Sequence, residues 1–139
     1  MTRIRGYALV NIIISLGITA LVISGAVVGV RRHGASARED QLRRDLTAVR
    51  TAVEEFREDT GLWPLVLTDL AVKAAPATGK NNSGATVALE ARNWRGPYIS
   101  VIPLDPISRV SFGYSPGPSG WVSSSATGTD SRGVAYLNY

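Results

Sequence analysis

The chain has 139 residues, with 15 basic and 11 acidic side chains, a formal net charge of +4 and no cysteine. The lack of cysteine excludes disulfides, thiolate metal sites and a thiol nucleophile. The net charge is small and both signs are mixed along the sequence, so nucleic acid is not an expected partner.

The N-terminal part is dominated by Gly6–Val30, a run without a single charged residue. It exceeds the roughly 20 apolar residues that cross a bilayer, and we therefore predict a membrane-spanning helix over residues 7–30. Arg3 and Arg5 precede it and favour a cytoplasmic N-terminus, with the remaining chain across the membrane. Three interpretations remain open: a permanent anchor, a Sec signal peptide cleaved after Ala26, and a segment cleaved after Gly6 and kept as a helix.

An amphipathic helix is predicted to continue over residues 31–60. Its apolar positions alternate in steps of four and three, which places them on one helix face: Leu42, Leu46, Val49, Val53 and Phe56. The stripe is too short for a coiled coil, which needs about three or four heptads, so we expect it to pack against the chain's own head. Gly61 and Pro64 predict the helix end, because Gly tolerates the left-handed conformation and Pro cannot continue the ladder.

Opposite charges recur at i and i+4 along the same helix, a spacing that brings side chains together on its surface. The pairs are Glu39 with Arg43, Asp40 with Arg44, and Arg50 with Glu54. We interpret them as a solvated face opposite the stripe.

The rest of the chain is expected to form a small head of an α+β protein, a long helix against a small antiparallel sheet. Residues 61–97 are interpreted as a loop-rich region with a turn or short helix at Leu65–Leu70, and residues 98–139 as the sheet and a C-terminal loop. Four β-prone runs between turn residues predict an antiparallel meander: Tyr98–Ile102, Val110–Tyr114, Trp121–Ser124 and Val134–Leu137. The tryptophans Trp63, Trp94 and Trp121 are expected as core or boundary anchors.

Catalytic patterns are missing from the sequence. His33 is the only histidine and lies beside Arg31 and Arg32, without a companion for a metal triad or a nucleophile. No GxSxG, Walker A, HExxH, dinucleotide-binding or EF-hand pattern occurs. We therefore expect no enzymatic activity.

A basic leader that ends in Gly6, followed by Tyr7 and an apolar helix, resembles the class III signal of type IV pilins and pseudopilins. More specific landmarks follow in order along the head, and their sequences resemble those of the major pseudopilin of type II secretion systems. They are Thr60–Pro64 (TGLWP), Trp94–Ile99 (WRGPYI), Pro103–Pro106 (PLDP), Phe112–Gly117 (FGYSPG) and Ser125–Gly133 (SATGTDSRG).

The resemblance implies a type IV pilin-like fold, with residues 1–6 as a leader that prepilin peptidase removes between Gly6 and Tyr7. It further implies N-methylation of Tyr7 and a homo-oligomeric filament held through residues 7–30, with Tyr7, Leu9 and Asn11 in the assembly contacts. The protein would begin in the inner membrane with a periplasmic head, and its partners would be minor pseudopilins and an inner-membrane assembly platform. It would then form the periplasmic pseudopilus that helps export folded proteins. The alternative is a type IV pilin or minor pilin for adhesion, motility or DNA uptake.

Two positions depart from the family pattern. Asn11 replaces a Glu thought to pair with the α-amino group of a neighbouring subunit, and an amide cannot neutralise that charge. The family's C-terminal loop binds Ca²⁺, and Asp130 aligns with one of its acidic ligands, but no Asp or Glu follows in Ser131–Tyr139. Since Ca²⁺ takes about six to eight oxygen ligands, we predict that this site is lost and that no cofactor is bound.

Overall fold

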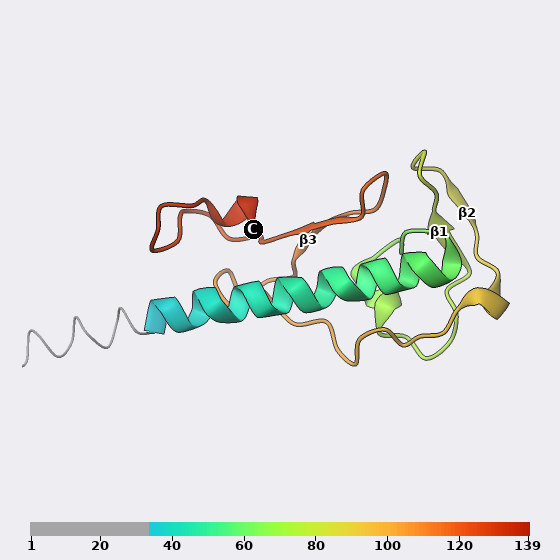
Figure 1. Ribbon diagram of the computed structural model, residues 1–139, viewed down its shortest axis with the longest axis horizontal. Coiled ribbons are helices and arrows are strands. Elements are labelled where there is room, and N and C mark those ends of the chain that lie inside the picture. Colours follow the sequence, from blue (N-terminus) through green and yellow to red (C-terminus); the bar gives the residue numbers. More distant parts are fainter. Residues whose placement is uncertain (1–33) are drawn as a thin grey trace, which may run out of the picture. The chain divides into compact units, whose positions relative to one another are not determined.

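A long helix is the main element of the computed structural model, which describes residues 34–139 (Figure 1). The helix covers residues 34–60. At its end Gly61 has φ 71°, and its N–H donates to the carbonyl of Arg57 at 2.8 Å. This is the left-handed helix end that glycine favours. The predicted end of the helix is thus confirmed.

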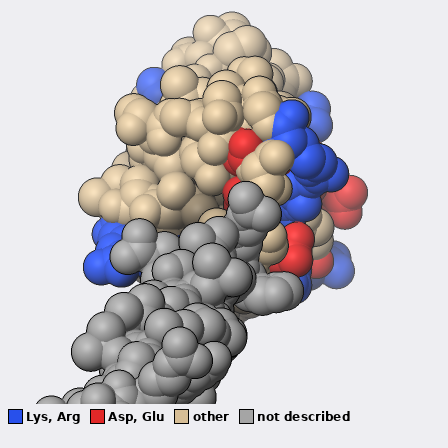
Figure 2. Space-filling model, turned by 90° about the vertical axis from the view of Figure 1, so that its left-hand side faces the viewer, with Lys and Arg blue, Asp and Glu red and all other residues tan. Residues whose placement is uncertain are grey.

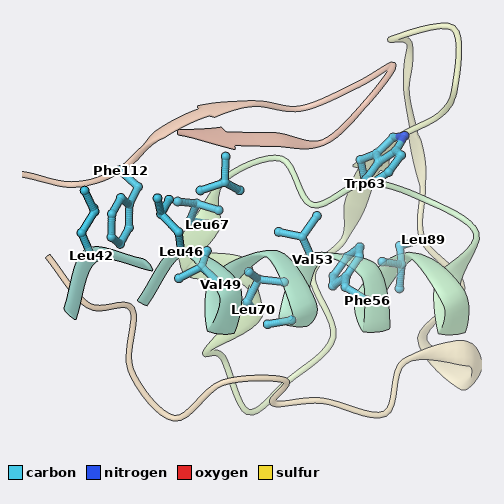
Figure 3. Packing of buried hydrophobic residues seen from close by; sticks show 12 residues of the cluster. Leu42, Leu46, Val49, Val53, Phe56, Trp63, Leu67, Leu70, Leu89 and Phe112 are labelled. Carbon is cyan, nitrogen blue, oxygen red and sulfur yellow. The ribbon is translucent and has the colours of Figure 1, made fainter. Parts of the chain in front are cut away.

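The apolar stripe of the helix forms half of the core (Figure 3). All five of its predicted members are buried, and the residues that cover them come from the head of the same chain: Trp63, Leu67, Leu70, Leu89, Phe112 and Val122. Burial of apolar surface contributes roughly 25 cal/mol per Å² to folding. The prediction that the stripe packs against the chain's own head is confirmed.

The head consists of short elements joined by long irregular segments. In chain order they are η1 (Leu67–Leu70), β1 (Thr78–Lys80), β2 (Thr86–Ala88), η2 (Ala91–Asn93), β3 (Gly113–Ser115), β4 (Trp121–Ser123) and η3 (Tyr136–Asn138). The strands make two separate antiparallel pairs, β1 with β2 and β3 with β4. The protein is therefore α+β, with one long helix and two small antiparallel sheets.

The predicted four-stranded meander is wrong. Of the expected runs, Trp121–Ser124 contains β4 and Val110–Tyr114 overlaps β3, while Tyr98–Ile102 and Val134–Leu137 contain no strand. The unexpected β1 and β2 lie in the loop-rich region. Both Tyr98 and Ile99 donate their N–H groups to the carbonyl of Leu70, at 2.9 and 3.3 Å. These two N–H groups bond to the last residue of η1 and are therefore not available for a strand ladder.

The predicted solvated face of ion pairs is confirmed only for the exposed residues Asp40, Arg44 and Glu54, and the pairing itself is wrong. None of the three i to i+4 pairs occurs among the salt bridges of residues 34–139; Arg43 instead meets Asp40 at 3.5 Å. Arg50 turns to the head, where it donates to the carbonyl of Val122 at 3.0 and 2.6 Å and stacks on Trp121. The head covers more of the helix than the stripe alone, so these charges find partners there.

The three tryptophans differ in depth. Trp63 is a core residue with 3% exposure, Trp94 is half-buried, and Trp121 is 52% exposed beneath the Arg50 guanidinium. The predicted role as core or boundary anchors is confirmed for Trp63 and Trp94 and is wrong for Trp121, which lies outside the core cluster.

Residues 34–139 contain no helix long and apolar enough to cross a membrane. The predicted spanning segment, residues 7–30, lies outside the described residues.

Candidate functional site in the C-terminal loop

Asp130 is the only predicted site residue within the described part of the chain, because Gly6, Tyr7, Leu9 and Asn11 lie outside it. Asp130 belongs to the stretch after β4, residues 128–139, which we call the C-terminal loop. This loop lies against the long helix through a cluster of polar side chains. It is the candidate site described here.

The backbone of the C-terminal loop is shaped around the Asp130 side chain. Its Oδ1 accepts hydrogen bonds from the N–H groups of Arg132 and Val134, both at 2.8 Å. The Asp130 N–H in turn donates to the Val134 carbonyl at 2.8 Å, and Gly133 adopts φ 82° within the turn. An aspartate that accepts from N–H groups a few residues further on is typical of tight turns. One carboxylate oxygen is thus used by the loop itself.

The other oxygen of Asp130 faces the helix. Its Oδ2 accepts from Arg43 Nη2 at 3.3 Å and from the Tyr139 hydroxyl. That hydroxyl also accepts from Arg43 Nη2, at 2.5 Å, and the guanidinium lies 5.1 Å from the centre of the Tyr139 ring. Arg132 Nε approaches the same oxygen at 3.4 Å. The three groups Arg43, Asp130 and Tyr139 form a closed triangle of hydrogen bonds, named the Arg43 triangle below.

A second carboxylate, that of Glu39, holds the loop one helix turn away. Ser131 donates to it twice, from its backbone N at 3.0 Å and from its Oγ at 2.7 Å, and the Tyr136 hydroxyl lies 3.4 Å from Oε1. Glu39 is only 5% exposed. Its expected place on a solvated face is therefore wrong, because the loop covers it. Every buried oxygen of this carboxylate has a donor, as buried polar groups require.

Protonation in the Arg43 triangle follows from these contacts. The hydrogen bond from Tyr139, then the N–H of Val134 and the charge of Arg43, hold the pKa of Asp130 below its ordinary value against the opposing effect of desolvation. Desolvation raises the pKa of Tyr139, and its hydrogen bond to Asp130 raises it further. At neutral pH the triangle therefore contains a carboxylate, a neutral phenol and a guanidinium.

These residues do not fit a calcium ion. Both oxygens of Asp130 already accept from two donors, and one of the donors at Oδ2 is the positively charged guanidinium of Arg43. Calcium needs about six to eight oxygen ligands. Among residues 34–139, no group of three or more His, Cys, Asp or Glu side chains is placed to hold a metal.

A shallow groove lies elsewhere on the head, between η1 and the segment that leads into β3. It has a volume of about 470 Å³ and is lined mainly by apolar side chains, among them Val66, Ile102, Leu104 and Phe112. Its polar side chains are the hydroxyls of Thr68, Ser111 and Tyr114, of which that of Tyr114 already donates to the carbonyl of Pro64 at 2.8 Å. The groove therefore offers little that would orient a polar substrate.

No family model, no curated protein and no solved structure matches this chain. The function of the chain is therefore inferred from its sequence and from the geometry of the C-terminal loop.

The sequence identified Asp130 through the family resemblance but did not identify Arg43, Tyr139 and Glu39 as its neighbours in the site. The glycines around Asp130 and the tyrosines after it indicate a tight loop, but they do not reveal which part of the helix it contacts.

Proposed function

We propose that this chain is a structural subunit of the periplasmic pseudopilus of a type II secretion system, with a type IV pilin-like fold and no catalytic activity. The supporting observation is the division of apolar surface along the chain. The head and residues 38–60 build a compact unit whose described core begins at Leu42. The uncharged run Gly6–Val30 is long enough to cross a bilayer, and in this proposal it is covered by lipid or by the same segment of other subunits.

The energetics of this run support assembly through it. Exposing apolar surface to water costs roughly 25 cal/mol per Å², so the segment can leave the bilayer only when neighbouring helices replace the lipid. We propose cleavage after Gly6 by prepilin peptidase, N-methylation of Tyr7, and filament contacts that include Leu9 and Asn11. The partners would be further copies, minor pseudopilins and the inner-membrane assembly platform, and the head would lie in the periplasm.

Nucleic acid has no place in this proposal. On the face of the molecule shown in Figure 2, acidic and basic side chains lie next to each other along one side, and uncharged residues cover most of the remainder. Binding to phosphate backbones relies on clustered Lys and Arg. The mixed arrangement on this face favours a structural role over DNA capture.

The N-terminus of the mature protein tests the proposal. We expect mass spectrometry of membranes with an active prepilin peptidase to find a chain that begins at methylated Tyr7. A start at Val27, or an intact Met1, would refute it. Gly6→Leu should block processing while the matched Gly17→Ala leaves it unchanged, and normal cleavage of the Gly6 variant would count equally against the proposal.

Asn11 favours a second candidate, a type IV pilin or a minor pilin. Without a charge at this position, the subunit would lack the pairing that a principal shaft subunit makes with its neighbour. Deleting the gene distinguishes the two functions. Accumulation of exported proteins in the periplasm supports the pseudopilus, whereas intact secretion with loss of surface pili, motility or DNA uptake supports the alternative.

A further inference from the structure

We infer that the Arg43 guanidinium serves as the built-in cation of the C-terminal loop, so that this loop is fixed to the long helix without any divalent metal ion. The inference concerns how the head is held together and does not depend on the proposed function. It follows from the geometry of the Arg43 triangle and from the exposure of the loop's apolar side chains.

The first observation is the position of the Arg43 guanidinium between the long helix and the C-terminal loop. Arg43 lies on the long helix, and its Nη2 contacts both Asp130 and Tyr139, which belong to the loop. A guanidinium presents several N–H donors in a fixed plane and stays charged at every physiological pH. It therefore supplies both the positive charge and the directional contacts that a loop carboxylate would otherwise need from a metal.

The second observation is that every oxygen of the two carboxylates already accepts hydrogen bonds. In Asp130, Oδ1 accepts from two backbone N–H groups, while Oδ2 accepts from Arg43 and the Tyr139 hydroxyl. The Glu39 carboxylate is held by Ser131. A calcium ion at Asp130 would have to displace these donors and would be repelled by the positive charge beside them. The cluster thus excludes the ion through its donors and its charge.

The aliphatic side chains of the loop do little to hold it in place, because Val134 is 45% exposed and Leu137 is 59% exposed. Its apolar contact with the core comes from the partly buried rings of Tyr136 and Tyr139. Its contacts with the helix are mainly the polar ones of Arg43 and Glu39. Loss of the Arg43 charge should therefore loosen the loop while the apolar core stays closed.

Hydrogen exchange of the full-length protein in detergent tests this inference. Exchange is followed by mass spectrometry in peptides from residues 128–139, with CaCl₂ or MgCl₂ at about millimolar concentration, the range of weak calcium sites, or with EDTA. We expect identical exchange and an identical melting temperature in all three solutions. Calcium-dependent protection of the loop, or a calcium-dependent melting temperature, would overturn the inference.

The variants separate the Arg43 charge from general damage to the helix. Arg43→Met should speed exchange in the loop by about tenfold, as expected when charge-assisted hydrogen bonds open, and leave the core peptide around Val53 unchanged. Arg44→Met, at an exposed position next to it, is the matched control and should have no effect.

Two further variants keep the test decisive if Arg43→Met folds poorly. Tyr139→Phe retains the ring but removes the bridging hydroxyl and should also speed loop exchange. In an Asp130→Asn background, the added effect of Arg43→Met should largely disappear, because the partner charge is already gone. Unchanged loop exchange in both Arg43→Met and Tyr139→Phe would refute the role of the triangle.

Discussion

The Asp105→Asn substitution should destabilise the protein by about 3 kcal/mol, because Asp105 is fully buried and both oxygens of its carboxylate accept hydrogen bonds. Its Oδ1 accepts from the N–H groups of Ile107 and Ser108, at 2.8 and 3.2 Å. Its Oδ2 accepts from Ser124 Oγ at 2.5 Å and from the Ser125 N–H at 3.0 Å. These contacts join the segment before β3 to the end of β4.

The expected loss of stability follows from which hydrogen bonds of the Asp105 carboxylate the amide of Asn can still make. One orientation of Asn keeps the two bonds at Oδ1, and Ser124 can reverse its hydroxyl to accept from the new NH₂ group. The Ser125 N–H would then face another donor, and an unsatisfied buried group costs roughly 1–3 kcal/mol, in addition to the weakening of bonds to a charged acceptor. For a domain of about 100 residues, 3 kcal/mol corresponds to a fall in melting temperature of roughly 12 °C or more.

Thermal unfolding followed by circular dichroism across a pH series is the assay. Burial raises the pKa of Asp105, but the hydrogen bonds from Ser124 and the backbone outweigh burial and leave the pKa below its ordinary value. The carboxylate therefore stabilises the fold above its ordinary pKa of about 4, and this stability is lost as the pH falls through the lower folded value. The difference in melting temperature between wild type and Asp105→Asn should therefore become smaller as the pH is lowered into this range.

Ser124→Ala is the matched control for this experiment, because it keeps the charge of Asp105. It removes two hydrogen bonds, the one that Ser124 Oγ donates to Asp105 and the one that it accepts from the Ala126 N–H at 3.0 Å. At about 1 kcal/mol for each bond, it should cost about 2 kcal/mol. Equal stability of Asp105→Asn and wild type at pH 7 would refute the reasoning. A gap that stays constant into strong acid would refute it too.

Two further predictions concern the core. Phe56→Ala should lower the free energy of unfolding by about 3–5 kcal/mol because it opens a cavity beneath the head. Thr51→Ala, at an exposed position, should change it by no more than about 0.5 kcal/mol. Similar melting temperatures for both variants would contradict the assigned core. Gly120→Ala would place a Cβ 2.2 Å from Trp63 Cε3 at φ 58°. We expect this variant to lose more free energy of unfolding, measured with denaturant, than Gly84→Ala, where φ is also positive but no atom lies within 4 Å of the new Cβ. A larger loss in Gly84→Ala than in Gly120→Ala would refute the close approach of Gly120 to Trp63.

The long helix could be predicted from the sequence because its signals are local. Five apolar residues at helical spacing identify one face, and Gly61 marks the end, so neither depends on distant parts of the chain. The structure buries all five residues and ends the helix at residue 60. The sequence also predicted that a head covers this face, since an apolar stripe of this width has to be buried against other apolar side chains.

The strands were harder to predict because each has only three residues. Pairs this short depend on their turns more than on β propensity. The β3–β4 turn has prolines and glycines and was recognised. The β1–β2 turn depends on Asn81, whose Oδ1 accepts from the N–H groups of Ser83 and Ala85 at 3.1 and 2.9 Å. The sequence Asn81–Gly84 indicates a turn, and it could have revealed this hairpin.

The partners of the charged helix residues could not be predicted in the same way. Glu39 and Arg43 satisfy the i to i+4 rule for a surface pair, but their actual partners Ser131 and Asp130 lie 92 and 87 positions further along the chain. Which charges stay in solvent depends on where the head covers the helix. Helix spacing alone carries no information about that coverage.

The helix of residues 34–60 therefore has no apolar face left for another subunit within its described contacts. The stripe is covered by the head, while Glu39, Arg43 and Arg50 are bound to the loop and to β4. The exposed positions that remain include Thr51, Glu54, Glu55 and Glu58, all polar. In the proposed filament, contacts through this face would be polar and weakened by salt. In the same proposal Gly6–Val30 would associate through apolar contacts, which salt does not screen, and high salt should therefore weaken the helix-face contacts more than those of this segment.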